Sequence, residues 1–226
     1  MTSPQPRIAL IAGASGLVGG ELLELLLEDP AVARVHSLVR RPSGRTNEAL
    51  AEQVVDFGKL AAAALPPAAD EAYCCLGTTM RAAGSREAFR QVDLDAVVAF
   101  GRLAVAAGTR SLAVVSSVGA DASARSFYLR IKGEMEGELA ALALPSLVIL
   151  RPSLLLGKRR ETRWGERVSE LGLRLASPFL RGSLARYRPV HARTVAGAMI
   201  AASRRAAPGV RVVESNEIPS LATPSP

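Results

Sequence analysis

The sequence is poor in aromatic, cysteine, histidine and lysine residues. Phe, Trp and Tyr make up 4% of the 226 residues, so the core has to be built from aliphatic side chains, for which a hydrophobic fraction of 49% is ample. Two separated histidines, His36 and His191, and the adjacent Cys74 and Cys75 provide no cluster of metal ligands. Neighbouring cysteines cannot crosslink distant segments, so we expect a reducing compartment, the cytoplasm.

Long hydrophobic runs are also absent. No apolar run reaches the roughly 18 residues that a membrane-spanning helix needs. The first residues, Met-Thr-Ser-Pro-Gln-Pro-Arg, have neither the basic start nor the hydrophobic stretch of a secretion signal. The sequence therefore predicts no membrane partner.

The positive charge is unevenly distributed along the chain. Residues 1–150 have 14 basic and 16 acidic side chains, whereas residues 151–226 have 14 basic and 5 acidic, which together give the net charge of +7. Almost all of the excess is arginine, which suits bidentate binding of phosphate. Because no nucleic-acid-binding motif is present there, we expect no nucleic acid as a partner.

Short apolar runs alternate with helical patterns over the first two thirds of the chain. The runs lack strict alternation, which is typical of parallel strands covered on both faces. This arrangement predicts an α/β fold, a doubly wound, mostly parallel Rossmann-type sheet with helices on both faces. The predicted strands are 8–12, 35–39, 54–56, 72–76, 112–115 and 147–150, and the predicted helices include one starting at Leu17, one over 89–107 and one over 128–142.

Beyond residue 157 the pattern is looser. It predicts helices near 164–177 and 192–204 and a short strand at 210–214. We expect residues 1–214 to form a single domain in which 157–214 supply a small substrate-side segment. The Pro- and Ser-rich residues 215–226 are expected to be a frayed tail.

A glycine motif follows the first predicted strand. Gly13, Gly16 and Gly19 form G-x-x-G-x-x-G between this strand and a helix. Glycines there allow a tight turn and a close approach of a pyrophosphate, and the start of the helix offers unpaired N–H groups to the phosphates. The motif indicates a dinucleotide cofactor.

The end of the second predicted strand selects between NAD and NADP. An acidic residue there accepts hydrogen bonds from the ribose 2′-hydroxyl of NAD. Arg40 and Arg41 stand there instead, and guanidinium groups suit a 2′-phosphate. The predicted cofactor is NADP(H).

Tyr128 and Lys132 are four residues apart within a predicted helix, so both side chains can reach one ligand. Ser116 and Ser117 follow the fifth predicted strand, at the sheet edge where open α/β folds bind ligands. A hydroxyl that polarises a carbonyl, a phenol that donates a proton and an ammonium that favours the ionised phenol suit carbonyl reduction. Strand alternation directs only one serine to the cleft, and Ser117 is our choice over Ser116.

Several segments together resemble the short-chain dehydrogenase/reductase superfamily, in its atypical NADP-binding branch that includes the Tat-interacting tumour-suppressor reductase-like protein. The resemblance covers about three quarters of the chain. The matching segments are Gly13-Ala-Ser-Gly16, Arg40-Arg41, Val54-Val-Asp-Phe57, Cys74-Cys-Leu-Gly-Thr-Thr79, Ser116-Ser-Val-Gly-Ala-Asp121, Phe127-Tyr-Leu-Arg-Ile-Lys-Gly-Glu-Met-Glu136 and Arg151-Pro-Ser153.

The resemblance implies a role for each matching residue. It places Tyr128 as the catalytic acid, Lys132 at the nicotinamide ribose, and Arg40 and Arg41 beside the 2′-phosphate. The other cofactor contacts that it implies are Ser15, Gly16, Leu17 and Val18 under the pyrophosphate, Asp56 and Phe57 near the adenine, Leu76 and Gly77 at the adenosine half, and Leu155 and Arg163 at the nicotinamide end and pyrophosphate.

Two positions depart from the pattern. The segment Val92-Asp93-Leu94 has no asparagine for the proton relay of many such reductases, and Ser153 replaces the family's glycine. We expect an NADP-dependent oxidoreductase for a small carbonyl/alcohol pair, as a monomer or a homodimer. The alternative is an NADPH-binding regulatory or interaction protein with little turnover.

Overall fold

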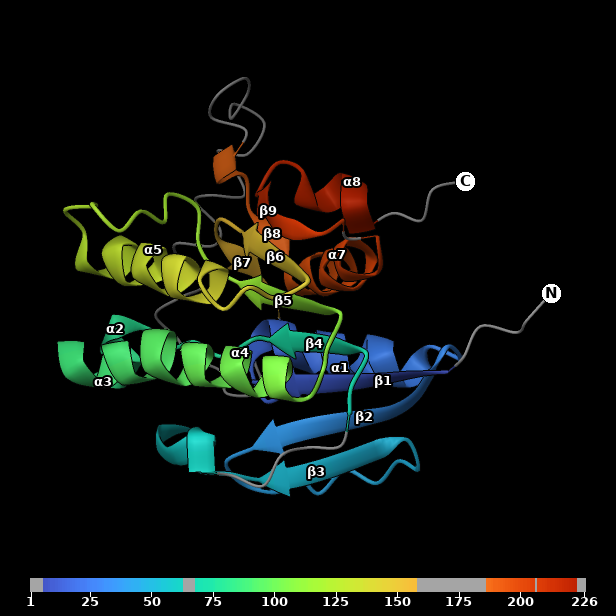
Figure 1. Ribbon diagram of the computed structural model, residues 1–226. Helices are drawn as coiled ribbons and strands as arrows, with labels where there is room; N and C mark the ends of the chain where they lie inside the picture. The colour runs from blue at the N-terminus through green and yellow to red at the C-terminus, as the bar shows by residue number, and fades with distance from the viewer. Residues whose placement is uncertain (1–5, 63–67, 158–185, 206, 223–226) are drawn as a thin grey trace.

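The sheet of the computed structural model runs through the whole molecule (Figure 1). The structure describes residues 6–62, 68–157, 186–205 and 207–222. Within these ranges, parallel strands pair in the order β3-β2-β1-β4-β5-β6-β9. The strands are β1 (Arg7–Ala12), β2 (Val32–Val39), β3 (Leu50–Val54), β4 (Glu71–Cys74), β5 (Ser111–Val115), β6 (Ser146–Arg151) and β9 (Gly209–Glu214), and β7 (Leu155–Leu156) pairs separately with β8 (Val190–His191).

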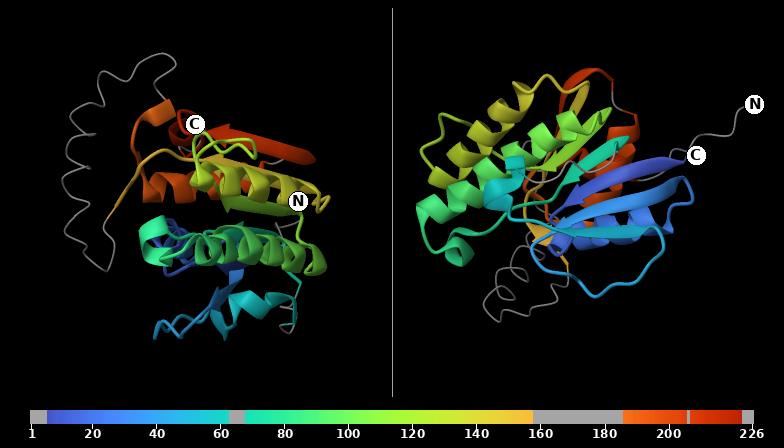
Figure 2. Two further views of the ribbon diagram at one scale, coloured as in Figure 1. Left: turned by 90° about the vertical axis from the view of Figure 1, so that its left-hand side faces the viewer. Right: turned by 60° about the horizontal axis from the view of Figure 1, so that its bottom comes forward.

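Helices cover both faces of the sheet, as the two turned views show (Figure 2). The helical elements are α1 (Leu17–Glu28), the 3₁₀ helix η1 (Phe57–Ala62), α2 (Met80–Ala83), α3 (Arg86–Arg90), the π-helical turn η2 (Gln91–Asp95), α4 (Ala96–Ala106), α5 (Phe127–Ala140), α7 (Ala192–Arg204) and α8 (Ile218–Ala222). The predicted doubly wound Rossmann-type fold is confirmed.

The core consists of two apolar clusters, one on each side of the sheet. On one side, Phe89, Phe100 and Met135 pack from α3, α4 and α5 against strand residues such as Leu10 and Ile149. On the other side, buried residues of α1 and α7, among them Leu22, Leu26, Val195 and Met199, pack against the opposite faces of the same strands, where Ile11 and Val148 are buried. Full burial of both faces explains why the strands read as continuous apolar runs.

The direction of the sheet order reverses between β1 and β4. From β1 the chain first moves outward through β2 to β3, and from β4 it moves the other way through β5 and β6. In open parallel sheets the crevice at such a switch point, outside the carboxyl ends of the strands, is where ligands bind. We call this edge of the sheet the carboxyl edge.

Three sequence predictions need correction. The third strand is Leu50–Val54 instead of 54–56, because this edge strand is only partly buried and its polar Glu52 and Gln53 conceal it. The helix predicted over 89–107 begins at Arg86, where the Ser85 hydroxyl accepts the Ala88 N–H, and it contains the π-helical turn η2.

The tail expected to fray from residue 215 is folded up to Ala222. It forms α8, and Ile218 is fully buried in the cluster on the α1 and α7 side because α8 packs against α7. The helix near 192–204 and the strand near 210–214 match α7 and β9. The predicted helix at 164–177 lies outside the described residues.

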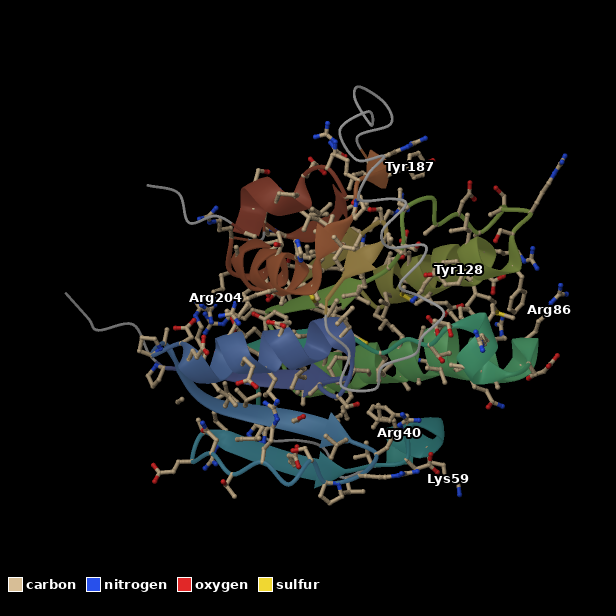
Figure 3. All side chains as sticks on the ribbon, turned by 180° about the vertical axis from the view of Figure 1, so that it is seen from behind. Arg40, Lys59, Arg86, Tyr128, Tyr187 and Arg204 are labelled. Carbon is tan, nitrogen blue, oxygen red and sulfur yellow. The ribbon has the colours of Figure 1, made fainter. Side chains whose placement is uncertain are left out.

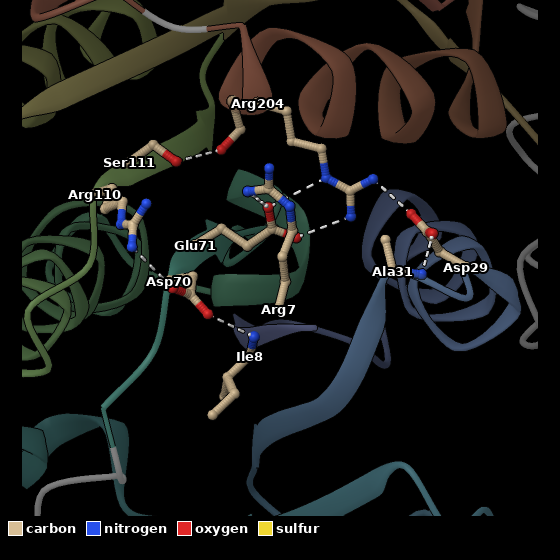
Figure 4. Close-up of polar contacts among 10 residues, drawn as sticks. Arg7, Ile8, Asp29, Ala31, Asp70, Glu71, Arg110, Ser111 and Arg204 are labelled. Carbon is tan, nitrogen blue, oxygen red and sulfur yellow. Dashed lines mark hydrogen bonds and ion pairs between the residues drawn. The ribbon is translucent and has the colours of Figure 1, made fainter. Parts of the chain in front are cut away.

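A polar network closes the amino end of the sheet, far from the carboxyl edge (Figure 4). The Arg204 guanidinium donates to both carboxylate oxygens of Glu71, at 3.2 and 3.1 Å, and to Asp29 at 2.5 Å. Glu71 is only 1% exposed, and Arg7 also lies 3.5 Å from it. This network ties α7 to β4 and to the end of α1.

Removing Arg204 is expected to destabilise the fold, because the buried Glu71 carboxylate then loses its two hydrogen bonds from Arg204 and retains the half-exposed Arg7 as its ion-pair partner among the described residues. We expect Arg204→Ala to lower the free energy of unfolding by about 2–4 kcal/mol, measured by urea denaturation. The control is Arg102→Ala, an exposed helical arginine without an ion pair among the described residues, for which we expect a change within about 0.5 kcal/mol. Equal losses in the two variants would contradict a stabilising role for the network.

The loss of stability expected for Arg204→Ala also depends on pH. Burial of Asp29 opposes its ionisation, but hydrogen bonds from Arg204 and the Ala31 N–H outweigh burial and hold the pKa of Asp29 below its ordinary 3.8. A lowered carboxyl pKa stabilises the fold above the ordinary value, and this contribution disappears as the pH falls. The difference between wild type and Arg204→Ala should therefore be largest near pH 7 and shrink toward pH 3.

Candidate functional site

The loop after β1 and the start of α1 form a glycine-rich cradle. Gly13 has φ +86°, and a Cβ there would lie 2.5 Å from the Cys75 backbone; a Cβ on Gly19 would lie 2.1 Å from the Gly13 oxygen. Helix α1 begins after Gly16 without a side-chain cap or an acidic residue in its first turn. Its first N–H groups therefore remain available to an anion at the carboxyl edge.

The other residues of the motif differ in their solvent exposure. Ser15 and Gly16 are exposed and Leu17 is half-buried, so these residues border the crevice. Val18 is 5% exposed, and its side chain packs into the cluster on the α1 and α7 side. Val18 can therefore donate a hydrogen bond to a phosphate only through its backbone N–H, while its buried side chain fixes the position of α1.

Arg40 and Arg41 follow β2 with both side chains exposed. The nearby Arg45 pairs with Glu24 at 2.6 Å, whereas the described residues provide no ion pair for Arg40 or Arg41. Figure 3 labels Arg40 at the same end of the sheet as Tyr128 and Arg204 at the opposite end. Two unpaired guanidinium groups therefore stand at the carboxyl edge.

Asp56 and Phe57 lie beyond β3, on the same side of the crevice. The Asp56 carboxylate accepts the Gly58 N–H at 2.9 Å through one oxygen, Oδ1, and its side chain is exposed. Phe57 is half-buried and packs against the core cluster on the α4 and α5 side. This pair offers an acceptor and an apolar surface, which suit an adenine base.

Lys132 is the most deeply buried cation of the site. It is 4% exposed, and its Nζ lies 2.7 Å from Oδ1 of Asp93, which is 1% exposed. Burial by itself lowers the pKa of Lys132, but the charges of Asp93 and Tyr128 outweigh burial and leave this pKa raised. Lys132 is therefore a fixed positive charge at neutral pH.

Asp93 also holds the loop after β4. Its second oxygen, Oδ2, accepts the Thr78 N–H at 2.8 Å. Gly77 lies beside the pair, since a Cβ there would be 3.3 Å from Asp93 Oδ1 and 3.8 Å from Lys132 Nζ. Leu76 is half-buried and packs at the edge of the core cluster. The Leu76–Gly77 segment thus borders the Lys132 ammonium.

Tyr128 lies one helical turn before Lys132 and is half-buried. Its ring packs at 53° against Phe89, with the ring centroids 5.5 Å apart. Phe89 belongs to α3, so the aromatic contact joins the helices on this side of the sheet. The phenol is accessible at the carboxyl edge while its ring is held by packing.

The two serines after β5 have different environments. Ser116 is buried and donates to the Glu136 carboxylate, which also receives two hydrogen bonds from Arg151. Ser117 is half-buried, and its hydroxyl has one long contact of 3.4 Å with the Val118 oxygen. The Ser116 hydroxyl is therefore occupied within the fold, whereas that of Ser117 can turn to a ligand.

Sequence reasoning missed Asp93, Glu136 and Arg151 as members of the site. Each is a single charged residue in a segment that resembles an ordinary amphipathic helix or strand end, so no local pattern reveals its partner. Leu155 lies half-buried on β7. Arg163 lies outside the described residues.

Among residues 6–62, 68–157, 186–205 and 207–222, no helix is both long and apolar enough to cross a bilayer. The same part of the chain contains no group of three or more His, Cys, Asp or Glu side chains that could hold a metal ion.

The chain is similar to one known protein family and to several individual proteins. The NAD dependent epimerase/dehydratase family matches residues 9–116. The chain is 39% identical over 168 residues to protein HTATIP2 of Rattus norvegicus, covering 72% of this chain and 68% of that protein. It is 36% identical over 170 residues to protein fmp52, mitochondrial, of Emericella nidulans, covering 72% of each.

Solved structures give the same fold. MoeE5 in complex with UDP-glucose and NAD matches with a TM-score of 0.68 at 19% identity, over 95% of this chain and 80% of that one. A short-chain dehydrogenase/reductase superfamily protein from Agrobacterium tumefaciens with bound NAD matches with a TM-score of 0.68 at 17% identity, over 93% and 78%. These likenesses agree with the Rossmann-type architecture.

The prediction of a cytoplasmic protein is wrong. Relatives from Emericella nidulans and Candida glabrata are named as mitochondrial proteins. The two free cysteines, Cys74 and Cys75, do not identify the compartment.

Burial also raises the pKa of both adjacent cysteines, Cys74 and Cys75. It raises the pKa of the fully buried Cys74 to about 12 and that of the partly exposed Cys75 above its ordinary value. Because the thiolate is the reactive form, we expect the native protein to react slowly with Ellman's reagent at pH 8, and two thiols to react at once in guanidinium chloride. Fast reaction of the native protein, abolished by Cys75→Ser, would contradict this expectation.

Proposed function

The chain belongs to the short-chain dehydrogenase/reductase superfamily, in the family of HTATIP2 and fmp52, and on that premise we propose that it is an NADP(H)-dependent oxidoreductase. The proposed substrate is a small carbonyl/alcohol pair. The observation that carries the proposal is the buried, charged Lys132 one helical turn from Tyr128 at the carboxyl edge. A buried lysine next to an accessible phenol suits proton transfer to a carbonyl oxygen.

The residues present fit a dinucleotide. Gly13 and Gly19 allow the loop after β1 to pack tightly against the start of α1 and the backbone after β4, and the uncapped start of α1 supplies N–H donors for a pyrophosphate. In this proposal Arg40 and Arg41 bind the 2′-phosphate, and Asp56 and Phe57 border the adenine. Leu76 and Gly77 are assigned to the adenosine half, Lys132 to the ribose of the nicotinamide, and Leu155 to the nicotinamide end.

The chemistry of the site follows from the protein's own groups. When bound, NADPH supplies a hydride for the carbonyl carbon. Ser117 donates a hydrogen bond to the carbonyl oxygen and polarises it, and the Tyr128 hydroxyl gives its proton to the same oxygen, so that the alcohol forms. The Lys132 ammonium stabilises the phenolate that this transfer leaves behind. In the direction of oxidation the same groups act in reverse.

The preference for NADP rests on Arg40 and Arg41, which have no acidic partner in the described structure. A charge-assisted hydrogen bond is worth about 1.5–3 kcal/mol. We therefore expect NADPH to stabilise the protein more than NADH in thermal-shift assays, and Arg40→Ala/Arg41→Ala to lose about 10- to 100-fold of the NADPH affinity with little change for NADH.

The matched control is Arg45→Ala, because Arg45 already pairs with Glu24. This variant should retain the preference for NADPH. Greater stabilisation of the wild type by NADH than by NADPH would overturn the assignment of Arg40 and Arg41 to a 2′-phosphate.

Turnover depends on the Tyr128 hydroxyl. We expect Tyr128→Phe to bind NADPH with unchanged affinity, because the ring still packs against Phe89, and to reduce small aldehydes and ketones about 10²- to 10⁴-fold more slowly. The assay follows NADPH absorbance over a panel of such compounds. If the wild type binds NADPH and none of the compounds turns over, the cofactor-binding regulatory alternative gains support over the enzyme.

A further inference from the structure

Asp93 is a buried acidic residue that the chemistry described above does not use. Its carboxylate is 1% exposed and has two contacts on different elements, Lys132 Nζ on α5 and the Thr78 N–H in the loop after β4. The π-helical turn η2 contains Asp93, and such turns widen a helix locally and often occur at functional sites. The carboxylate is thus held at one point between three segments.

Stability alone does not account for this pair. Removing two charges from water costs several kcal/mol per ion, and a buried ion pair is often no more stabilising than two apolar side chains of similar size. The surrounding cluster on the α4 and α5 side is apolar and well packed. The buried Asp93–Lys132 pair is therefore better explained by a need to hold the Lys132 charge at a fixed position.

The backbone at Gly77 lies against the Asp93–Lys132 pair. A Cβ at Gly77 would be 3.3 Å from Asp93 Oδ1, which is a tight contact, and 3.8 Å from Lys132 Nζ, which is an ordinary one. Asp93 reaches Lys132 from η2, and its Oδ1 lies 2.7 Å from Nζ. This contact holds the ammonium in place before any ligand binds.

We propose that Asp93 is the positioning residue of the site, which keeps Lys132 charged and directed toward the nicotinamide ribose. This inference rests on the proposed function. The same carboxylate fixes the loop at Thr78, so it sets the distance between that loop and the Lys132 ammonium. Asp93 acts through Lys132 and does not itself contact the substrate.

The experiment compares two ligands that share the adenine half of NADPH. NADPH extends to Lys132, whereas adenosine 2′,5′-bisphosphate ends before the nicotinamide ribose. We expect Asp93→Asn to weaken NADPH binding at least ten-fold and to bind adenosine 2′,5′-bisphosphate within two-fold of the wild type, as measured by calorimetry. Asparagine keeps an oxygen for the Thr78 N–H, so this substitution removes the charge and leaves the loop contact.

The matched control is Asp95→Asn, which removes an exposed carboxylate from the same π-helical turn and should change neither affinity. A second comparison tests the route through Lys132. Adding Asp93→Asn to Lys132→Met should weaken NADPH binding no further than Lys132→Met alone, because residues that act as one unit are not additive.

Each outcome decides between alternatives. Wild-type affinity of Asp93→Asn for NADPH would overturn the proposal, and so would an equal loss for both ligands, which indicates a general effect on the fold. If Asp93→Asn does not fold, Asp93→Glu replaces it, and the same selective loss for NADPH is expected because the charge moves by one methylene. Failure of the wild type to bind either ligand would instead overturn the proposed function.

Discussion

The carboxyl edge of the sheet depends on one steric constraint, the close approach of three backbone segments. The loop after β1, the start of α1 and the loop after β4 meet where neither Gly13 nor Gly19 has space for a Cβ. Any side chain at Gly13 would meet the Cys75 backbone, and any at Gly19 would meet the Gly13 oxygen. The position of α1, and with it the direction of its N–H groups, follows from this contact.

The loop after β4 is also held by the buried Asp93 carboxylate. Gly13 contacts it at Cys75, and the Asp93 carboxylate accepts the Thr78 N–H, so the intervening Leu76 and Gly77 have little freedom. Asp93 in turn pairs with Lys132 on α5. The phosphate cradle and the Tyr128–Lys132 helix are thus connected through a single short loop, although they lie far apart in the sequence.

The sequence predicts the periodic and local features of this protein well. Each of these features has a signal within a few neighbouring residues. They are the buried strands, the glycine turn, the Tyr128–Lys132 spacing and the two arginines after β2. The pairing of Asp93 with Lys132 and of Ser116 with Glu136 has no such signal, because each pair forms only when η2, β5 and α5 have packed. The sequence does not reveal the bounds of edge strand β3 or the existence of helix α8, because both are stabilised by packing against neighbouring elements of the fold and not by their own composition.

The central claim is that this edge binds NADP(H) with its 2′-phosphate at Arg40 and Arg41 and its nicotinamide at Tyr128. A crystal structure with NADP⁺ measures both contacts at once. We predict 2′-phosphate oxygens at hydrogen-bond distance, about 2.7–2.9 Å, from a guanidinium of Arg40 or Arg41, and the Lys132 ammonium bonded to the nicotinamide ribose while it keeps Asp93. A cofactor whose 2′-phosphate points into solvent, or whose nicotinamide lies away from Tyr128, would contradict the claim.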